Sequence, residues 1–537
     1  MRRTVLLIAL LAGAWTAPLA AREAVPASAP SALAVTMYRD PARGIGDEMD
    51  RRWPRGFAMI TETRTVTLPP GESTVRFEGV AEGMVAVSAI VTGLPGGTIE
   101  KNRNADLLSP AALVDGTLGN RVMVTRTNPA TGVAVSESAV VRTRADGGLV
   151  LQTSEGFEAV RCAGMPEKLT FDRVPAGLSP QPVFSIDTRD AAGGTYTVEL
   201  TYLAWGFDWQ AHYVATLDER GRGGAVGLKL MSWLTLLNDN GQSFPDAELL
   251  VVAGRLNVVS DFEALADPPR ARGLYLTCYP LGSTASGSAE VADMAFRGLR
   301  PPPPPPPAPI MAMAREAQDI VVTGSSIANK AQEEALGDLK LYRVPERVTI
   351  AAQSLKQVAF LDQNDVEGRL LYSTSCSPWD EQDEPQPTSI LLATVNDKRH
   401  GLGMALPMGG VTVFEPSAYG DQLVAEDRVR DYAEGQDVEL GLGESRQVFA
   451  QCERADVKGE DDGENANWRP MRTTVSNANP QPVMLRVALG SPVDLQFRGL
   501  KRTRVKDGVT IAEVTIPGNS RRVVAWDVRR ASDTASD

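Results

Sequence analysis

Apolar and polar residues alternate in short segments along the chain, and this alternation constrains the fold more than any other feature. Between residues 197 and 203, Val198, Leu200 and Tyr202 would share one face of an extended chain, with polar side chains on the opposite face. A period of two residues is typical of a half-buried β-strand. Similar segments lie at residues 65–68, 74–79, 122–127, 348–350 and 514–516.

Residues that favour turns separate these segments. The chain has 48 glycines and 37 prolines in 537 residues, a content that long helical bundles do not tolerate. The turn signals lie at residues 69–71, 95–97, 128–129, 146–148, 240–241 and 506–508. Short strands at this spacing predict antiparallel sandwiches or small barrels. No alternation of strands and helices with a Gly-rich first turn occurs, so a doubly wound nucleotide-binding fold is not expected.

We therefore expect a mainly β chain with two β regions. The first is an N-terminal β domain, in which residues 118–160 predict a small SH3-like barrel. The second is an antiparallel β-sandwich region that resembles a known family and is interrupted by a Pro-rich insertion. The expected divisions are a signal peptide (1–21), an N-terminal segment (22–56), the N-terminal β domain (57–193), the first part of the sandwich region (194–263), the insertion (264–336), its second part (337–530) and a tail (531–537).

The start of the chain has the pattern of a secretory signal peptide. Arg2 and Arg3 precede an apolar run at residues 4–15, and Pro18 and Ala21 lie in a small-residue exit. The run is too short to span a bilayer, and no later apolar run reaches the length of a spanning helix. We expect export to the periplasm or secretion, with no transmembrane segment after the signal is removed.

Four cysteines, Cys162, Cys278, Cys376 and Cys452, are the disulfide candidates. Their number is even, and the chain is expected to enter an oxidising compartment, so disulfides are the favoured interpretation. Three pairings are open. Cys376 with Cys452 is the preferred pair because both fall in the C-terminal region. No Cys-X-X-Cys motif occurs, so a zinc knuckle or a thioredoxin-type centre is not expected.

The insertion at residues 264–336 is rich in Gly, Ser and Pro and contains seven consecutive prolines at 301–307. In the polyproline II conformation such a tract is a stiff rod of roughly 22 Å. A spacer is the favoured interpretation, and docking on an aromatic groove of a partner is the alternative. Residues 319–325, DIVVTGS, are interpreted as a β-prone adhesive segment. They also resemble the N-terminal edge of the plug domain of TonB-dependent receptors, and this alternative would imply an outer-membrane partner.

Five ordered motifs between residues 202 and 448 carry a resemblance to a family. They read YLAWGFDWQAHYVATLD (202–218), LKLMSWLTLLNDNGQSFPDAELLVVAGRLN (228–257), GDLKLYRVPERVTIAAQSLKQVAFL (337–361), LATVNDKRHGLGMALPMGGVTVFEP (392–416) and AEDRVRDYAEGQDVELGLGESRQV (425–448). With a late element at 473–489, they resemble the bacterial domain-of-unknown-function family 4139, whose best-known members are mucoidy-inhibitor-A-like envelope proteins. The resemblance covers about residues 194–530 apart from the insertion.

This resemblance implies a β-rich extracytoplasmic region without an accepted enzymatic role, so it assigns no catalytic residue. Many members carry a long coiled coil ahead of this region, and no heptad run occurs here. The motif residues have a structural character: an aromatic cluster is expected to anchor the core, with carbohydrate stacking as the alternative, and residues 238–241, NDNG, have the chemistry of a tight turn. The cluster consists of Trp205, Phe207, Trp209 and Tyr213.

The search for chemistry assigns no catalytic, cofactor-binding or metal-ligating residue. The common hydrolase and nucleotide-binding motifs are missing, and the two histidines have bland contexts: His212 reads as a core or edge residue and His400 as part of a turn. Two acidic clusters, at residues 380–384 and 460–464, read as solvated loops rather than cation sites. The formal net charge of −13 disfavours nucleic acid as a partner.

Two functions from different classes follow. The favoured one is an exported, non-enzymatic envelope scaffold or binding protein that contacts other envelope proteins, through strand addition at exposed sheet edges or through its Pro-rich tract. The alternative is a hydrolase that cleaves envelope polysaccharide with two carboxylates, a chemistry that needs no histidine. An exposed Trp beside a concave pair of carboxylates would favour the hydrolase.

Overall fold

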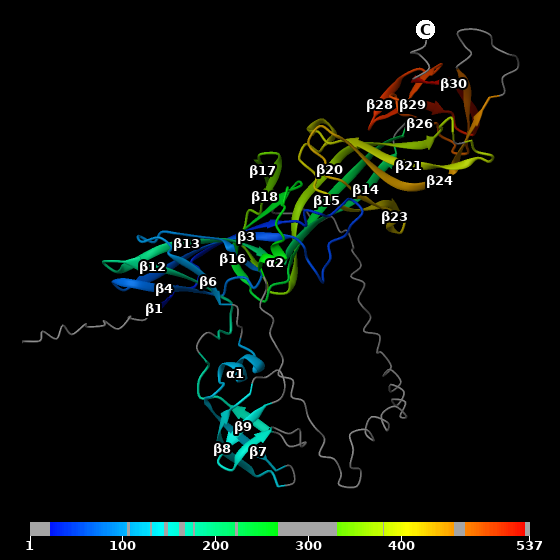
Figure 1. The fold of residues 1–537 in the computed structure, drawn as a ribbon. Coiled ribbons are helices and arrows are strands. Elements are labelled where there is room, and N and C mark those ends of the chain that lie inside the picture. Colours follow the sequence, from blue (N-terminus) through cyan, green and yellow to red (C-terminus); the bar gives the residue numbers. More distant parts are fainter. Residues whose placement is uncertain are drawn as a thin grey trace, which may run out of the picture. The chain divides into compact units, whose positions relative to one another are not determined.

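A computed structural model describes residues 22–531, except 105–107, 129–130, 144–148, 160–166, 176–177, 221–223, 267–329, 380 and 456–467 (Figure 1). The fold is mainly β, with 62% strand and 4% helix, as the alternation predicted. The predicted signal peptide and most of the predicted insertion lie outside the described residues. No helix of the described part is long and apolar enough to cross a membrane.

The chain divides into two compact units, and each is made of several segments. Unit 1 comprises Met1–Ala32, Thr61–Tyr202 and Asp267–Leu281, and unit 2 comprises Leu33–Ile60, Leu203–Ala266 and Gly282–Asp537. Two strands, β3 (Phe57–Leu68) and β13 (Gly194–Trp205), run from one unit into the other.

Unit 1 contains a four-stranded mixed sheet in the order β1-β4-β12-β6. Alternate residues of β4 are buried, among them Val75 and Phe77, whereas β12 buries six consecutive residues, Val183–Thr188. Strand β1 pairs with β4 in parallel, whereas β12 is antiparallel to both of its neighbours. The strands are β1 (Glu23–Pro26), β4 (Gly71–Glu78), β6 (Glu100–Asn104) and β12 (Val183–Asp190), and β5 (Met84–Thr92) also belongs to unit 1.

A separate antiparallel sheet of unit 1 lies where the SH3-like barrel is predicted. Its order is β10-β9-β8-β7-β11, and its core packs against helix α1 (Pro110–Gly116) through Ala111 and Val114. A β region at this place is confirmed, but no closed barrel occurs among the described residues. The strands are β7 (Arg121–Thr127), β8 (Ala134–Val141), β9 (Val150–Thr153), β10 (Gly156–Ala159) and β11 (Glu167–Thr170).

Unit 2 contains a sheet of thirteen strands with the main order β23-β22-β14-β15-β20-β21-β24-β25-β30-β27, and β26, β28 and β29 branch from this path. Its pairings are both parallel and antiparallel. The strands are β14 (Phe207–Arg220), β15 (Ala225–Asn238), β20 (Ser354–Ser375), β21 (Gln386–Val395), β22 (Gly409–Ser417), β23 (Gly420–Val429), β24 (Asp437–Arg454), β25 (Arg469–Asn477), β26 (Val483–Gly490), β27 (Leu495–Arg498), β28 (Thr503–Lys506), β29 (Val509–Ile516) and β30 (Ser520–Arg530).

The remaining elements of unit 2 flank the predicted insertion. Strand β16 (Phe244–Ala253) pairs with β2 (Ala32–Tyr38), β18 (Leu339–Arg343) and β19 (Val348–Ile350). Helix α2 (Phe262–Ala266) and strand β17 (Gln332–Leu336) lie inside the interval 264–336 or overlap it. Strand β17 pairs with β18 along its whole length. The ends of that interval therefore belong to the folded unit.

Two turns of unit 2 share a sequence pattern and a set of hydrogen bonds. Residues 238–242, between β15 and β16, and residues 477–481, between β25 and β26, both read Asn-X-Asn-X-Gln. In each turn the side chain of the first Asn accepts a hydrogen bond from the N–H of the second at 3.0 Å. It donates to the carbonyl of the Gln at 2.9 and 3.1 Å, and at 3.0 Å to the carbonyl of Ala351 in one case and of Pro517 in the other.

The strands around these turns pair in the same register. Asn238 lies opposite Ser354 and Asn477 opposite Ser520. Six residues after each of these Asn residues, Phe244 lies opposite Ile350 and Val483 opposite Ile516. Strand β16 also pairs in parallel with β2, as β26 does with β20. Unit 2 thus contains an internal structural repeat.

A sequence signal for this repeat exists beyond the two turns. Residues 348–354 read VTIAAQS and residues 514–520 read VTIPGNS. Gln353 and Asn519 occupy equivalent positions with left-handed φ angles of 46° and 48°. Their backbone N–H groups donate to Asn240 at 3.1 Å and Asn479 at 2.8 Å. The predicted turn at 238–241 is confirmed, and it is one copy of a repeated device.

The aromatic cluster and one disulfide agree with expectation. Phe207, Trp209 and Tyr213 are at most 2% exposed and form part of the core, whereas Trp205 is half-buried. Cys376 and Cys452 form a disulfide with a Cα–Cα distance of 5.3 Å, as the preferred pairing predicts. The other candidates, Cys162 and Cys278, lie outside the described residues.

Candidate functional site

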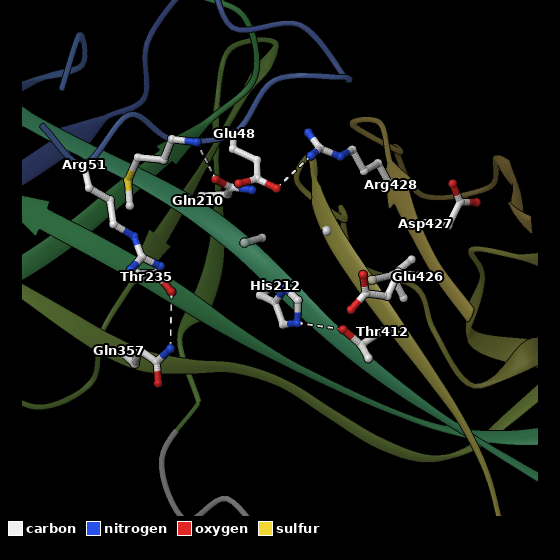
Figure 2. A pocket seen from close by; sticks show the side chains of 14 residues that line it. Glu48, Arg51, Gln210, His212, Thr235, Gln357, Thr412, Glu426, Asp427 and Arg428 are labelled. Carbon is white, nitrogen blue, oxygen red and sulfur yellow. Dashed lines mark hydrogen bonds and ion pairs between the residues drawn. The ribbon is translucent and has the colours of Figure 1, made fainter. Parts of the chain in front are cut away.

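A polar groove of about 560 Å³ crosses one face of the large sheet of unit 2 (Figure 2). Its floor is formed by five strands that are successive neighbours in the sheet, β23, β22, β14, β15 and β20. Residues 48–51 form a further part of its wall. The polar side chains lining it are Glu48, Arg51, Gln210, His212, Thr235, Gln357, Thr412, Glu426, Asp427 and Arg428.

The alternation on β14 explains why the groove is polar. Ala211 and Tyr213 point into the core, so the intervening side chains of Gln210 and His212 lie on the opposite face. Strand β22 approaches β14 closely because residue 409 is glycine. A Cβ atom at Gly409 would meet the carbonyl oxygen of Ala211 at 2.0 Å. The parallel pairing of β14 with β22, and hence the groove, depends on this glycine.

Hydrogen bonds between neighbouring strands hold the groove side chains in place. His212 Nε2 lies 3.1 Å from Thr412 Oγ1, and Gln357 Nε2 donates to Thr235 Oγ1 at 3.5 Å. The backbone N–H of Met49 donates to Gln210 Oε1 at 2.8 Å. These contacts join two strand pairs, β14 with β22 and β15 with β20, and tie β14 to the wall segment. The groove is therefore preformed.

Charges of both signs line the groove. Arg428 donates to Glu48 Oε1 at 2.8 Å and to the carbonyl of Gly46. Asp427 accepts a hydrogen bond from the backbone N–H of Gly441. Figure 2 shows Glu426 on the β22–β23 side of the groove, near the exposed ring of His212. Desolvation lowers the pKa of His212, although Glu426 opposes the shift. The imidazole is therefore neutral at neutral pH.

His212 was predicted to be a core or edge residue, and this prediction is wrong. Its ring is exposed rather than in the core, and β14 has partner strands on both sides, so His212 does not lie at a sheet edge either. The other polar groove residues were not singled out. Polar residues at alternate positions of long aliphatic strands were the available signal, because they mark a solvated sheet face. That signal cannot say which strands lie side by side.

The second histidine occupies a turn, as predicted. His400 ends a short 3₁₀ helix, η2 (Lys398–His400), and Gly401 follows with a φ of 84°. Its Nδ1 lies 2.7 Å from Asp397 Oδ1, and its backbone N–H donates to the same carboxylate. These contacts lower the pKa of Asp397 to about 2. The ring nitrogen and the backbone N–H of His400 both bind the Asp397 carboxylate and so hold the turn together. This histidine therefore has a structural role.

The acidic clusters offer little for a metal. No group of three or more His, Cys, Asp or Glu residues in the described part of the chain is arranged to hold a metal ion. Within the first cluster, Glu381 accepts a hydrogen bond from the backbone N–H of Arg454 at 3.2 Å. Asp380 and the whole of the second cluster, residues 460–464, lie outside the described residues.

One end of the groove adjoins an edge strand. Strand β23 is the last strand of the sheet order, and its partner in the described structure is β22. The first five residues of β23 are exposed, with Leu423 at 57% and Val424 at 41%, and Tyr419 in the preceding turn is 95% exposed. Val424 is the extra residue of a bulge between the pairs Phe414–Leu423 and Val413–Ala425. This edge offers backbone groups and apolar side chains together.

No protein-family model matches the chain, and no curated protein matches it either. The resemblance to the domain-of-unknown-function family 4139 therefore stays a prediction from the motifs.

Proposed function

We propose that this chain is a non-enzymatic binding protein of the bacterial cell envelope, similar in its C-terminal region to family 4139, and exported to the periplasm or secreted. Its partner is an extended segment of another envelope protein, which adds as a strand to β23. In this proposal the two repeated elements of unit 2 form the predicted sandwich region. The SH3-like assignment of the N-terminal sheet belongs to the same proposal.

The edge of β23 is the observation that carries the proposal. An edge strand presents a row of N–H and C=O groups to which another strand can pair. Strand addition obtains affinity from these main-chain bonds and specificity from pockets for alternate side chains. Leu423 and Tyr419 supply exposed apolar contacts, and the groove beside Glu426 supplies polar ones. The later part of β23 lies against β24, where Asp427 accepts the N–H of Gly441. The exposed stretch Gly420–Val424 is therefore the part of this edge that fits a binding role.

The hydrolase alternative has weaker support from the same groove. Hydrolysis of a glycosidic bond needs one carboxyl group as acid and a second as base or nucleophile. Of the three carboxylates here, Glu48 is paired with Arg428, and Asp427 is bonded to the Gly441 N–H. The lining contains no tryptophan. Glu426 is thus the one groove carboxylate without a hydrogen bond or ion pair to another described residue, which favours binding over two-carboxylate chemistry.

Site-specific photocrosslinking in the cells that make the protein tests this function. A benzophenone amino acid replaces Leu423 in one variant and Thr216, on the interior strand β14, in the control variant. We expect one defined adduct, identified by mass spectrometry, from position 423 and none from position 216. Adding Val424→Pro should abolish the adduct, because proline removes an N–H yet is tolerated at a bulge. Equal adducts from both positions, or none from position 423, would contradict strand addition.

A further inference from the structure

A second cleft of unit 2 combines an exposed tryptophan with polar groups. It has a volume of about 420 Å³ and lies between the segment that follows β20 and the turn from β26 to β27, beside the end of β30. The residues that line it are Ser377, Trp379, Gly490, Ser491, Val493, Asp494, Leu495 and Arg530. Trp379 is 55% exposed and Val493 is 81% exposed. The cleft thus presents apolar surface to water at a concave place.

The chain segment that carries Trp379 is tethered by a disulfide and by backbone hydrogen bonds. The disulfide between Cys376 and Cys452 ties it to β24, and the Cys376 N–H donates to the carbonyl of Ala488 at 2.8 Å. Arg454 donates to the carbonyl of Pro378 at 2.8 Å. The N–H of Trp379 itself donates to Ser377 Oγ at 3.3 Å. An exposed indole on a tethered loop is preorganised to receive a ligand.

The opposite wall is an ordered turn. Ser491 accepts hydrogen bonds from the N–H groups of Asp494 at 3.3 Å and Leu495 at 3.0 Å. The carbonyl of Asp494 accepts from Ala531 at 2.9 Å. Gly490 has a φ of 133°, and a Cβ atom there would meet Leu495 Cδ1 at 2.8 Å. The turn therefore holds the Asp494 side chain at the mouth of the cleft, where it is exposed.

The chemistry of these groups suits a sugar ring. The CH face of a pyranose is apolar and packs on an indole, while its hydroxyls need planar donors and acceptors at the rim. The guanidinium of Arg530 lies over the Trp379 ring in a cation–π contact, 5.9 Å from the ring centre, so a sugar would stack on the part of the indole that Arg530 leaves open. Arg530 supplies donors there, and Asp494 supplies acceptors. The volume is at the lower end of ligand sites, enough for one or two sugar residues.

We propose that this cleft binds an oligosaccharide, with one ring stacked on Trp379 and its hydroxyls held by Asp494 and Arg530. Asp494 is the single carboxylate among the described lining residues, whereas hydrolysis of a glycosidic bond needs two carboxyl groups. In this proposal the site therefore binds a glycan without cleaving it. The cleft shares no lining residue with β23 or with the polar groove. The glycan proposal can therefore be tested independently of strand addition.

Titration of the full chain with soluble tetrasaccharides tests the proposal. The probes are chitotetraose and cellotetraose, followed by calorimetry and by tryptophan fluorescence. We expect saturable binding of at least one probe, at least tenfold weaker in Trp379→Ala, several-fold weaker in Asp494→Asn and retained in Trp379→Phe. The control is Trp53→Ala, which removes a tryptophan that is 48% exposed and does not line the cleft.

Three outcomes would overturn the proposal. The first is the absence of binding by either tetrasaccharide in the folded wild-type chain. The second is binding that Trp379→Ala leaves unchanged, which would place the sugar elsewhere. The third is binding of a heptaproline peptide, lost in Trp379→Ala, together with no binding of either sugar. That last result would make the cleft a polyproline site, because aromatic grooves also receive polyproline II segments.

Discussion

At the scale of single residues, buried charges are where the chain departs most from simple alternation. In unit 2, Asp208 and Arg43 form an ion pair in which neither side chain is more than 3% exposed. Asp208 Oδ1 also accepts hydrogen bonds from the N–H of Trp209 at 2.8 Å and of Asp40 at 3.2 Å. By alternation Asp208 falls on the polar face of β14 with Gln210 and His212, so the pattern predicts a solvated carboxylate there and not one buried beside the aromatic cluster.

The pH dependence of stability reports on Asp208. Burial raises its pKa from 3.8 to about 6, although Arg43 opposes the shift. A carboxyl group whose pKa is raised by folding stabilises the fold fully below the unfolded value, and that contribution is lost as the pH rises through the folded value. We expect the free energy of unfolding of the wild type, relative to Asp208→Asn, to fall by about 3 kcal/mol between pH 4 and pH 8. Urea unfolding of both proteins at each pH measures this, and a difference that stays flat or rises with pH would contradict it.

In unit 1 a second buried pair makes a prediction of its own. Arg64 Nε donates to Glu62 at 2.8 Å, and the hydroxyl of Tyr202 donates to the same carboxylate at 2.8 Å. Both side chains of the pair are at most 3% exposed. Glu62→Ala leaves the Arg64 charge buried and unpaired, which costs about 3–5 kcal/mol. Tyr202→Phe removes one hydrogen bond to a charged group and should cost about 1–3 kcal/mol.

The next strand along the chain, β4, offers a matched control for the Glu62–Arg64 pair. Arg76 and Glu78 on β4 have the same spacing of two residues and approach to 3.4 Å, but their side chains are 26% and 51% exposed. Glu78→Ala should therefore change the free energy of unfolding by less than about 1 kcal/mol. Denaturant unfolding of the three variants measures the series. A loss in Glu62→Ala no larger than that in Glu78→Ala would show that the buried pair contributes little.

At the scale of elements, the repeated Asn turns connect sequence to topology. The side chains of Asn238 and Asn477 bind backbone N–H and C=O groups that would otherwise have no partner in a tight turn. Both side chains are at most 2% exposed. Asn477→Ala should destabilise unit 2 by about 2–4 kcal/mol, because it removes the three hydrogen bonds that Asn477 shares with Asn238 and two more, to the carbonyl of Ile516 and from Asn479 Nδ2. Asn238→Ala should have a similar or smaller effect, since it removes the three shared bonds. Thermal and urea unfolding measure both, with the exposed Asn364→Ala as the control.

Asn477→Asp separates hydrogen bonding from packing at this turn. Aspartate keeps the shape and the acceptor but loses the donor, and it turns a buried oxygen toward the carbonyls of Gln481 and Pro517. We expect it to destabilise at least as much as alanine. If Asn477→Asp were as stable as the wild type, the donated bonds would not hold the turn.

The elements that the sequence predicted best were the strands themselves. The segments at 197–203, 348–350 and 514–516 lie in β13, β19 and β29. Pairing could not be predicted, because the parallel contact of β14 with β22 depends on Gly409 meeting a strand about 200 residues away in sequence. The N-terminal barrel was predicted from two segments within residues 118–160, VMVTRTNP and LVLQTSEGFEAV. Closure depends on the pairing of the edge strands, which such local segments do not specify.

At the scale of the whole molecule, the repeat shows which connection between strands contains the long insertion. In the second copy a short path with β27 and β28 leads from Gly490 to Val509. In the first copy the equivalent path runs from Ala253 to Val348 and contains the Pro-rich tract. Strands β16 and β18 pair directly on either side of it, from Ala253 with Lys340 onward. The insertion therefore enlarges a connection and leaves the sheet pairing of unit 2 unchanged.

The boundary of this insertion can be measured with two deletions. Replacing residues 267–329 by a Gly/Ser linker of about 20 residues, which spans roughly 25 Å, shortens the connection at a gain of about 1 kcal/mol in loop-closure free energy. We expect a melting temperature equal to or slightly above that of the wild type. Replacing residues 264–336 by the same linker also removes β17, in which Glu333 accepts the N–H of Ala405 at 2.8 Å and pairs with Lys340. This variant should melt several degrees lower. Equal melting temperatures for the two deletions would mean that β17 contributes nothing to the fold, and a large loss in the shorter deletion would mean that residues 267–329 carry part of the stability of the chain.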